Sequence, residues 1–531
     1  MTNLNGESVF PDAPTDRDQQ LHEFDELDPE SGKVSESVLP RDEESQASTE
    51  GTRTWPALPD RSVYVIDFDG PNDPSHPHNW PLKTKLYLSA MLGLVCFSST
   101  FDSAIFSPST AQVAEHFGVS QEVAILTSSL YIVGFACGPL FWGPLSELYG
   151  RRIPIVVSML GFGIFNTAVA VSKDLQTLLV CRCFSGIFGS CPIVVVAASF
   201  ADLYNNRQRG IAISLFSDLV FLGPLAAPSI GGFINESFLG WRWTGYIPAF
   251  MGYAAFAINL CFLKETYPPV ILVAKAAELR RSTQNWGIHA KHEQVEIDFH
   301  ELVVRNLTRP VLMLCREPLI IAVTAYMSFI YGLLYCFLSA YPTIFQGVHG
   351  MSPGIGGLPL FGVAVGLLAG TVYMIYACKE YNAKLAANGS LPPIPEWRLP
   401  PVIVGGVLFS IGLFWLGWTG FTNRIHWIVP TLSGLCTGAG LLIIFIQLLN
   451  YTIDTYLMYA ASALAANAFC RSFMAAAFPL FTRQMFDNMG IQWAGTLLGC
   501  IAAALVPIPI TFLLYGKILR LKSRFVPAPD A

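Results

Sequence analysis

The chain has 531 residues, of which 52% are hydrophobic and 13% charged, and its formal net charge at pH 7 is −6. Soluble proteins carry about 25% charged residues, so this composition excludes an ordinary soluble protein. It predicts instead a chain that buries most of its surface in lipid. The modest negative charge gives no reason to expect nucleic acid as a partner.

The first 83 residues are rich in Asp, Glu, Ser and Pro, and their few apolar residues show no helical period. Such a segment buries too little apolar surface to offset the entropy of folding, so we predict that residues 1–83 are disordered. The first long apolar run begins near Leu86, so no cleavable signal peptide is expected and this run would also direct membrane insertion.

Twelve apolar runs follow, each with about the 20 residues that a helix needs to cross a bilayer. The longest break separates six runs from six. The sequence therefore predicts an all-α membrane protein with a six-helix bundle over 84–264, a central loop over 265–318, a second six-helix bundle over 319–516 and a tail over 517–531. The predicted spans are 86–107, 123–143, 153–172, 177–200, 211–233, 243–263, 319–341, 356–378, 400–420, 427–449, 457–480 and 494–516.

Lysine and arginine set the predicted orientation. If both termini are cytoplasmic, nineteen of these residues lie in the inner connections and the tail, against four in the outer ones, Lys173, Arg242, Arg424 and Arg483. Within the central loop, the basic stretch from Val273 to Arg281 has two open interpretations: a helix along the membrane surface, or a solvated linker helix.

The connection between the second and third spans reads Gly143-Pro-Leu-Ser-Glu147-Leu-Tyr-Gly150-Arg151-Arg152. The glycines permit a tight turn and close helix approach, and Glu147 and Arg151 are four residues apart, a spacing at which they can pair. The alternative is a plain turn that carries positive charge. We call the stretch from Gly143 to Arg152 the latch. No such pattern occurs near Lys379 in the second half, so the latch is predicted to be one-sided.

The fifth span contains Gly223-Pro224-Leu-Ala-Ala227-Pro228-Ser-Ile-Gly231-Gly232. Gly223, Ala227 and Gly231 recur every four residues and form a smooth face for tight helix packing. The prolines weaken the backbone hydrogen bonds and bend the helix.

Asp102, Arg182 and Asp218 are ionisable residues that interrupt apolar runs of the predicted spans. Charge in hydrocarbon is costly, so each is a candidate for proton coupling. Arg182 faces a cavity or a partner, or else extends to the headgroups. The alternative for the acids is a structural pair with Arg182 or Arg471.

Aromatic side chains in the spans suit a cavity for flat or cationic ligands, although aromatics also face lipid or pack between helices. The candidates for lining a substrate cavity are Phe101, Phe216, Tyr331, Tyr335, Gln447 and Asn467.

These motifs resemble those of the major facilitator superfamily, and further stretches resemble its fungal twelve-span drug:proton antiporters over roughly residues 75–525. The further stretches are Asn79-Trp80-Pro81, Lys264 to Pro269, Tyr335 to Pro342, Asn450-Tyr451, Asp454-Thr455-Tyr456, Arg471-Ser472 and Ala477 to Phe481. The resemblance implies two pseudo-symmetric bundles. It also implies a charge relay of Glu147, Arg151 and Asp202, a proton-coupling role for Arg182, and an antiporter motif at Gly223, Pro224, Gly231 and Gly232.

The function expected from this resemblance is secondary active export of drugs, toxins or secondary metabolites, with no enzyme activity. The proton gradient would supply the energy, and no cofactor or metal is expected. The expected partners are a small-molecule substrate, protons and the lipid bilayer, with the chain acting as a monomer in the plasma membrane or, alternatively, the vacuolar membrane. A transporter-like nutrient sensor and a proton-coupled importer are the alternative functions.

Overall fold

The computed structural model describes residues 64–70, 72–294, 299–388, 394–521, 523 and 525, all within the compact unit Asp60–Ala531. The described residues are mostly helical. The helices are α1 (Leu82–Ile105), α2 (Thr110–Phe117), α3 (Gln121–Cys137), α4 (Pro139–Leu148), α5 (Arg152–Val171), α6 (Leu175–Gly189), α7 (Cys191–Leu203), α8 (Asn206–Glu236), α9 (Trp243–Phe262), α10 (Pro268–Thr283), α11 (Phe299–Arg316), α12 (Pro318–Tyr341), α13 (Leu360–Ala387), α14 (Leu399–Gly420), α15 (Ile428–Tyr456), α16 (Ala460–Met489), α17 (Ile491–Leu505) and α18 (Pro507–Leu521).

Twelve spans in the described part of the chain are long and apolar enough to cross a membrane, which confirms the predicted number. Several spans consist of two consecutive helices: α3 with α4, α6 with α7, and α17 with α18. Each break is followed by a proline, at Pro139, Pro192 or Pro507. Because proline lacks the backbone N–H, it interrupts the helical hydrogen-bond ladder at these points.

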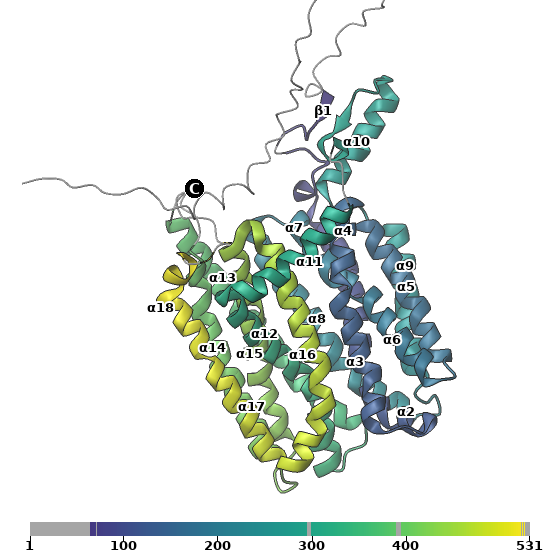
Figure 1. Cartoon of the computed structure of the whole chain (residues 1–531), viewed down its shortest axis with the longest axis vertical. Coiled ribbons are helices and arrows are strands. Elements are labelled where there is room, and N and C mark those ends of the chain that lie inside the picture. Colours follow the sequence, from purple (N-terminus) through teal and green to yellow (C-terminus); the bar gives the residue numbers. More distant parts are fainter. Residues whose placement is uncertain are drawn as a thin grey trace, which may run out of the picture. The chain divides into compact units, whose positions relative to one another are not determined.

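The contacts between helices repeat in the two halves of the chain. In the first half α1 packs on α8, α5 on α9, and α3 on α6; in the second half the equivalent spans pair as α12 on α16, α14 on α17, and α13 on α15. This correspondence gives the two six-helix bundles their pseudo-symmetry. Figure 1 shows the first half in purple to blue and the second half in green to yellow.

The most extensive helix contacts between the two halves are those of α3 with α16 and of α8 with α13. These pairs are also equivalent, because each combines the second span of one half with the fifth span of the other. The site described below lies between these two contacts.

The prediction of disorder up to residue 83 is wrong for residues 64–70 and 72–83, which have defined structure; residues 1–63 lie outside the described part. The two-residue strand β1 (Val65–Ile66) pairs in parallel with β2 (His289–Ala290) of the central loop. A 3₁₀ helix, η2 (Pro77–Asn79), precedes α1. Sequence pattern alone missed β1 because its partner strand lies more than two hundred residues further along the chain.

We call residues 64–70 and 72–80, together with α10, β2 and η4 (Lys291–Gln294), the clasp. The Lys275 Nζ of α10 lies 2.7 Å from Asp69 Oδ2 and 3.2 Å from Asp73 Oδ2. The backbone N–H groups of Asp69 and Ser75 donate to Asp73, and with the Lys275 ammonium they hold the pKa of Asp73 well below its usual range. The basic stretch of α10 therefore binds an acidic segment of the chain, which favours the linker interpretation over the membrane-surface one.

Candidate functional site

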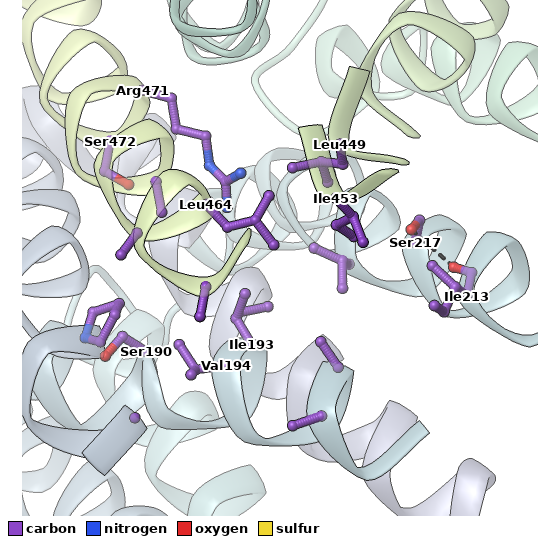
Figure 2. A pocket seen from close by; sticks show the side chains of 18 of the residues that line it. Ser190, Ile193, Val194, Ile213, Ser217, Leu449, Ile453, Leu464, Arg471 and Ser472 are labelled. Carbon is purple, nitrogen blue, oxygen red and sulfur yellow. Dashed lines mark hydrogen bonds between the residues drawn. The ribbon is translucent and has the colours of Figure 1, made fainter. Parts of the chain in front are cut away.

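A cavity of about 480 Å³ lies between the two halves. Its walls come from α3, α4, α7 and α8 of the first half and from α12, α15 and α16 of the second. Figure 2 shows Ile193 and Val194 of α7 facing Leu464 and Arg471 of α16 across this space. The size falls within the range of pockets that hold drug-sized molecules.

The cavity reaches the end of the bundle where α4 turns into α5, because Gly143, Glu147 and Arg151 line it there. We call this the latch end and the opposite end the distal end. The charge bias of the sequence predicts that the latch end is cytoplasmic.

Two of the six predicted cavity residues, Phe216 and Tyr331, line this space. The other four are buried outside it. Phe101 packs near Phe97, and the Tyr335 hydroxyl donates to Ser103 Oγ at 3.0 Å. Spacing along a helix could not separate these positions, because every face of a central span is covered by some neighbouring helix.

The remaining two predicted residues make polar contacts within the second half. The Gln447 amide lies 3.5 Å from Met374 Sδ. The Asn467 amide nitrogen lies 3.5 Å from Thr324 Oγ1, and its oxygen accepts from Arg471 Nη1 at 3.4 Å. Asn467 therefore contacts a cavity residue without lining the cavity itself.

Arg182 is completely buried and pairs with Asp102, so the headgroup interpretation is excluded. Its Nη1 lies 2.7 Å from Asp102 Oδ1, and Nη2 and Nε donate to the backbone carbonyls of Asp102 and Thr127, each at 3.0 Å. The faces of the guanidinium contact the rings of Phe106 and Tyr131. This buried pair ties α1 to α6, and the second carboxylate oxygen of Asp102 has no hydrogen-bond partner among the described residues.

Asp218 occupies a different environment, at the contact between α8 and α13. Its Oδ2 accepts from the Thr371 hydroxyl at 2.7 Å, and its buried Oδ1 has no hydrogen-bond partner among the described residues. The two residues belong to opposite halves. A movement of one half against the other would therefore change the surroundings of this carboxylate.

The latch end contains the predicted pair of Arg151 and Asp202, with Arg151 Nε 3.1 Å from Asp202 Oδ2. Arg151 also donates to Ser146 Oγ at 2.8 Å and stacks over the Tyr267 ring. Glu265 accepts from the backbone N–H groups of Arg151 and Arg152 at 2.8 and 3.0 Å. Glu265 lies in the stretch from Lys264 to Pro269 that resembles the family, but its contact with the latch was not predicted, because it follows the sixth span and is far from Arg151 along the chain.

Two details of the predicted latch are wrong. Glu147 does not pair with Arg151, since the turn directs Arg151 towards Asp202 and leaves Glu147 exposed at the mouth of the cavity. Gly143 allows no close approach, because no atom lies within 4 Å of where its Cβ would be. The glycine that the turn requires is Gly150, with φ of +83° and the Glu265 carboxyl carbon 2.6 Å from the position of a Cβ.

The prediction of a one-sided latch is also wrong. In the second half Arg398, at the start of α14, places Nε 2.8 Å from Asp454 Oδ2, at the end of α15, and stacks on the Tyr381 ring. The third and fourth spans of the first half carry Arg151 and Asp202 in the equivalent places. Sequence comparison missed the second pair because its arginine is not preceded by the glycine-rich turn.

At the distal end the halves are in contact. A Cβ on Gly232 would lie 2.5 Å from the Pro353 carbonyl oxygen, and the Glu236 carboxylate accepts from the Gly354 N–H at 2.7 Å. Gly223 and Gly231 instead pack on α1 within the first half, where a Cβ would lie 2.7 Å from Phe101 N and 2.6 Å from Ile105 O. The predicted packing face of the fifth span therefore exists, and Gly232 extends it to the other half.

The sequence of residues 92–479 matches the family model described as Major Facilitator Superfamily. The chain belongs to the major facilitator superfamily. It is 48% identical to the "Major facilitator superfamily multidrug transporter FLU1" of Candida albicans over 88% of this chain and 77% of that protein. It is 46% identical to the "Multidrug transporter TPO1_2" of Candida glabrata over 88% of this chain and 81% of that one.

Among solved structures, the fold is similar to the proton:xylose symporter XylE, with a TM-score of 0.59 and 16% identity over 82% of this chain and 97% of XylE. This likeness concerns the fold alone. Membership of the superfamily identifies the chain as a multi-pass membrane transporter of small molecules, with the cavity between its halves as the candidate site.

Proposed function

We propose that the chain exports drugs, toxins or other small organic molecules by proton antiport, through alternating access of the cavity to the two sides of the membrane. The observation that carries this proposal is the cavity itself, which reaches the latch end while glycine contacts join the halves at the distal end. A site between two rigid halves can change sides when the halves rock. The relatives FLU1 and TPO1_2 are both named multidrug transporters, which supports drugs as the substrate class.

Asp218 is our candidate for the coupling acid. A coupling group must exchange a proton as the halves move, and Asp218 bridges the halves with one oxygen unpartnered. Asp102 is enclosed with Arg182 inside the first half. We expect Asp218→Asn to retain substrate exchange and lose concentrative export, because the amide keeps the shape but cannot titrate. Loss of exchange as well, or export at the parental rate, would exclude Asp218 as the coupling acid.

The experiment that tests the proposed function is export of a fluorescent drug from energised cells, with and without a protonophore. We expect concentrative export that the protonophore abolishes. A proton-coupled importer would accumulate the drug inside the cell, and a sensor would transport the drug in neither direction. We place the protein in the plasma membrane with both termini cytoplasmic, which tags on the termini would check by their accessibility in intact and permeabilised cells.

A further inference from the structure

One cation in the wall of the cavity has no carboxylate partner. Arg471 lies midway along α16 and points into the space between the halves (Figure 2). Its Nη1 donates to Asn467 Oδ1 at 3.4 Å, and its guanidinium carbon lies 4.9 Å from the Phe445 ring and 5.5 Å from the Tyr331 ring. Among the described residues it forms no ion pair.

The acids that could compensate this charge are occupied elsewhere. Asp102 pairs with Arg182, Asp202 with Arg151, and Asp454 with Arg398. The carboxylate of Asp218 accepts from Thr371 and does not line the cavity. Glu147 lines the mouth of the cavity and is exposed to solvent.

The contacts of Arg471 leave one edge of its guanidinium without hydrogen-bond partners. Nη1 is held by Asn467, whereas Nε and Nη2 form no hydrogen bond with any described residue, and Nε is buried. These two nitrogens make up the side of the guanidinium that can grip both oxygens of a carboxylate. The rings of Tyr331 and Phe445 lie close to the planar group and restrict its orientation.

We infer that Arg471 selects substrates that carry a carboxylate on a flat, apolar body. The carboxylate would accept from Nε and Nη2, and the apolar body would lie among side chains such as Phe216, Phe221 and Leu464. A cationic ligand would be repelled, and a neutral one would leave the partly buried Arg471 without a counter-charge, which is costly in a membrane. This inference rests on the proposed function, because it names the substrate class of the same cavity.

The test uses three aromatic probes of similar shape: 1-naphthoate, 1-naphthamide and 1-naphthylmethylammonium. Binding to the purified full-length protein is measured by isothermal titration calorimetry in detergent. We expect naphthoate to bind about ten- to a hundredfold more tightly than naphthamide, as for a bidentate pair with charge assistance. The ammonium should bind more weakly than the amide.

Two variants assign the selectivity to the side chain. Arg471→Gln should remove the preference for naphthoate while the affinity for naphthamide stays within about twofold. Arg471→Lys should retain part of the preference, because a point charge replaces the two-pronged donor. The matched control is Arg483→Gln on the same helix, where an exposed arginine lies 3.7 Å from Asp487; it should bind all three probes as the parent does.

The inference is overturned if the parent binds naphthoate no better than naphthamide, if it binds none of the probes at millimolar concentration, or if the preference survives in Arg471→Gln. The first two outcomes need no variant, so a variant that fails to fold does not protect the inference. Binding is measured in detergent without a proton gradient, so its result does not depend on whether the protein exports. A chain that prefers naphthoate but does not export would refute the proposed function alone, and one that exports a drug without this preference would refute the inference alone.

Discussion

At the scale of single residues, Arg182 and Arg471 both lie within membrane spans but differ in what compensates their charge. Arg182 has a carboxylate, two carbonyls and two aromatic rings, whereas Arg471 has one amide oxygen and two rings. Desolvating a charge costs several kcal/mol unless a partner offsets it. The complete set of partners around Arg182 indicates a structural contribution, and the incomplete set around Arg471 indicates contact with a ligand.

The ion pair of Asp102 and Arg182 leads to a prediction about stability. Asp102→Asn leaves the arginine buried without its counter-charge, and we expect it to lower the free energy of unfolding by about 3–5 kcal/mol. Thermal unfolding of the purified protein would show this as a lower midpoint. The double variant Asp102→Asn with Arg182→Gln removes both charges and should recover most of the loss. A single variant as stable as the parent would contradict the assignment.

The sequence identified the buried acids but could not say which was paired. Asp102 and Asp218 look alike as polar interruptions of apolar runs, and only the packing of α1 on α6 and of α8 on α13 separates them. Asn467 was expected to line the cavity and instead orients the arginine that does. Such distinctions depend on side-chain direction in three dimensions, which spacing along one helix does not fix.

At the scale of elements, glycine in α8 has a different consequence from glycine in α4. A Cβ at Gly231 would meet the Ile105 carbonyl oxygen, and a backbone atom cannot move aside as a side chain can. Gly143 has open space instead. Both glycines belong to motifs, but only Gly231 is closely packed. Gly143 is therefore a matched control for substitutions at Gly231.

We predict that Gly231→Ala lowers the free energy of unfolding by about 1–3 kcal/mol and reduces export, without preventing membrane insertion. Gly143→Ala should have the stability of the parent or slightly more, because alanine is the better helix former. The measurement is thermal unfolding of both variants beside the parent. Equal midpoints for the two variants would show that α8 does not need the close approach to α1.

The clasp gives a prediction of pH dependence. Burial, and then the neighbouring His78, lower the pKa of His76 below its usual value, while Asp73 acts in the opposite sense. A lowered pKa means that the folded clasp prefers neutral His76, so this contribution to stability is present above about pH 6.5 and is lost as the pH falls through the folded pKa. The pKa of Asp73 is held far lower, so Asp73 stays ionised in this window.

We therefore expect hydrogen exchange in residues 64–70 and 72–80, corrected for the intrinsic rate, to quicken between pH 7.5 and pH 5.5. His76→Asn should remove this dependence, because asparagine does not titrate yet can still accept from the His78 N–H, as the imidazole does at 3.1 Å. Exchange in α14 serves as the internal control. Protection of the clasp that is the same at both pH values would show that His76 makes no such contribution.

The elements themselves were largely predictable, and the reason is physical. Hydropathy over about 20 residues is a local property, so all twelve spans could be located before any packing was known. The clasp, the role of Glu265 and the pairing of Arg398 with Asp454 could not, because each joins segments far apart in the chain. Where family motifs supplied the long-range information, as for Arg151 and Asp202, the pairing was found.

At the scale of the whole molecule, the two ends of the bundle differ in how the halves meet. At the latch end each ion pair lies within one half, Arg151 with Asp202 and Arg398 with Asp454. At the distal end glycine contacts and a charged hydrogen bond cross between the halves. The distal contacts are therefore the ones that must break for the cavity to reach the other side.

Gly232→Val tests whether the distal contacts hold the cavity closed at that end. The added side chain would meet the Pro353 carbonyl and the Gly354 Cα, and we expect it to open the distal end at the expense of the present conformation. A destabilisation of about 1–3 kcal/mol would change the ratio of the two conformers roughly 5- to 150-fold. Distances between spin labels at the distal end report the change.

The control is Gly347→Val, where no atom lies within 4 Å of the added Cβ. It should give the distance distribution of the parent. If Gly232→Val gives that distribution too, the contact between α8 and the Pro353 loop does not hold the distal end closed.

The pairing of β1 with β2 also bears on the order in which the protein is made. Val65 pairs with His289, which is synthesised 289 − 65 = 224 residues later. At about 5–20 residues per second, the earlier strand waits roughly 10–45 seconds on the ribosome for its partner, while the six spans between them emerge. The strand pair thus forms only once the first bundle has been translated. A nascent chain arrested before residue 289 should expose residues 64–70 and 72–80 to protease, and one arrested well beyond it should protect them.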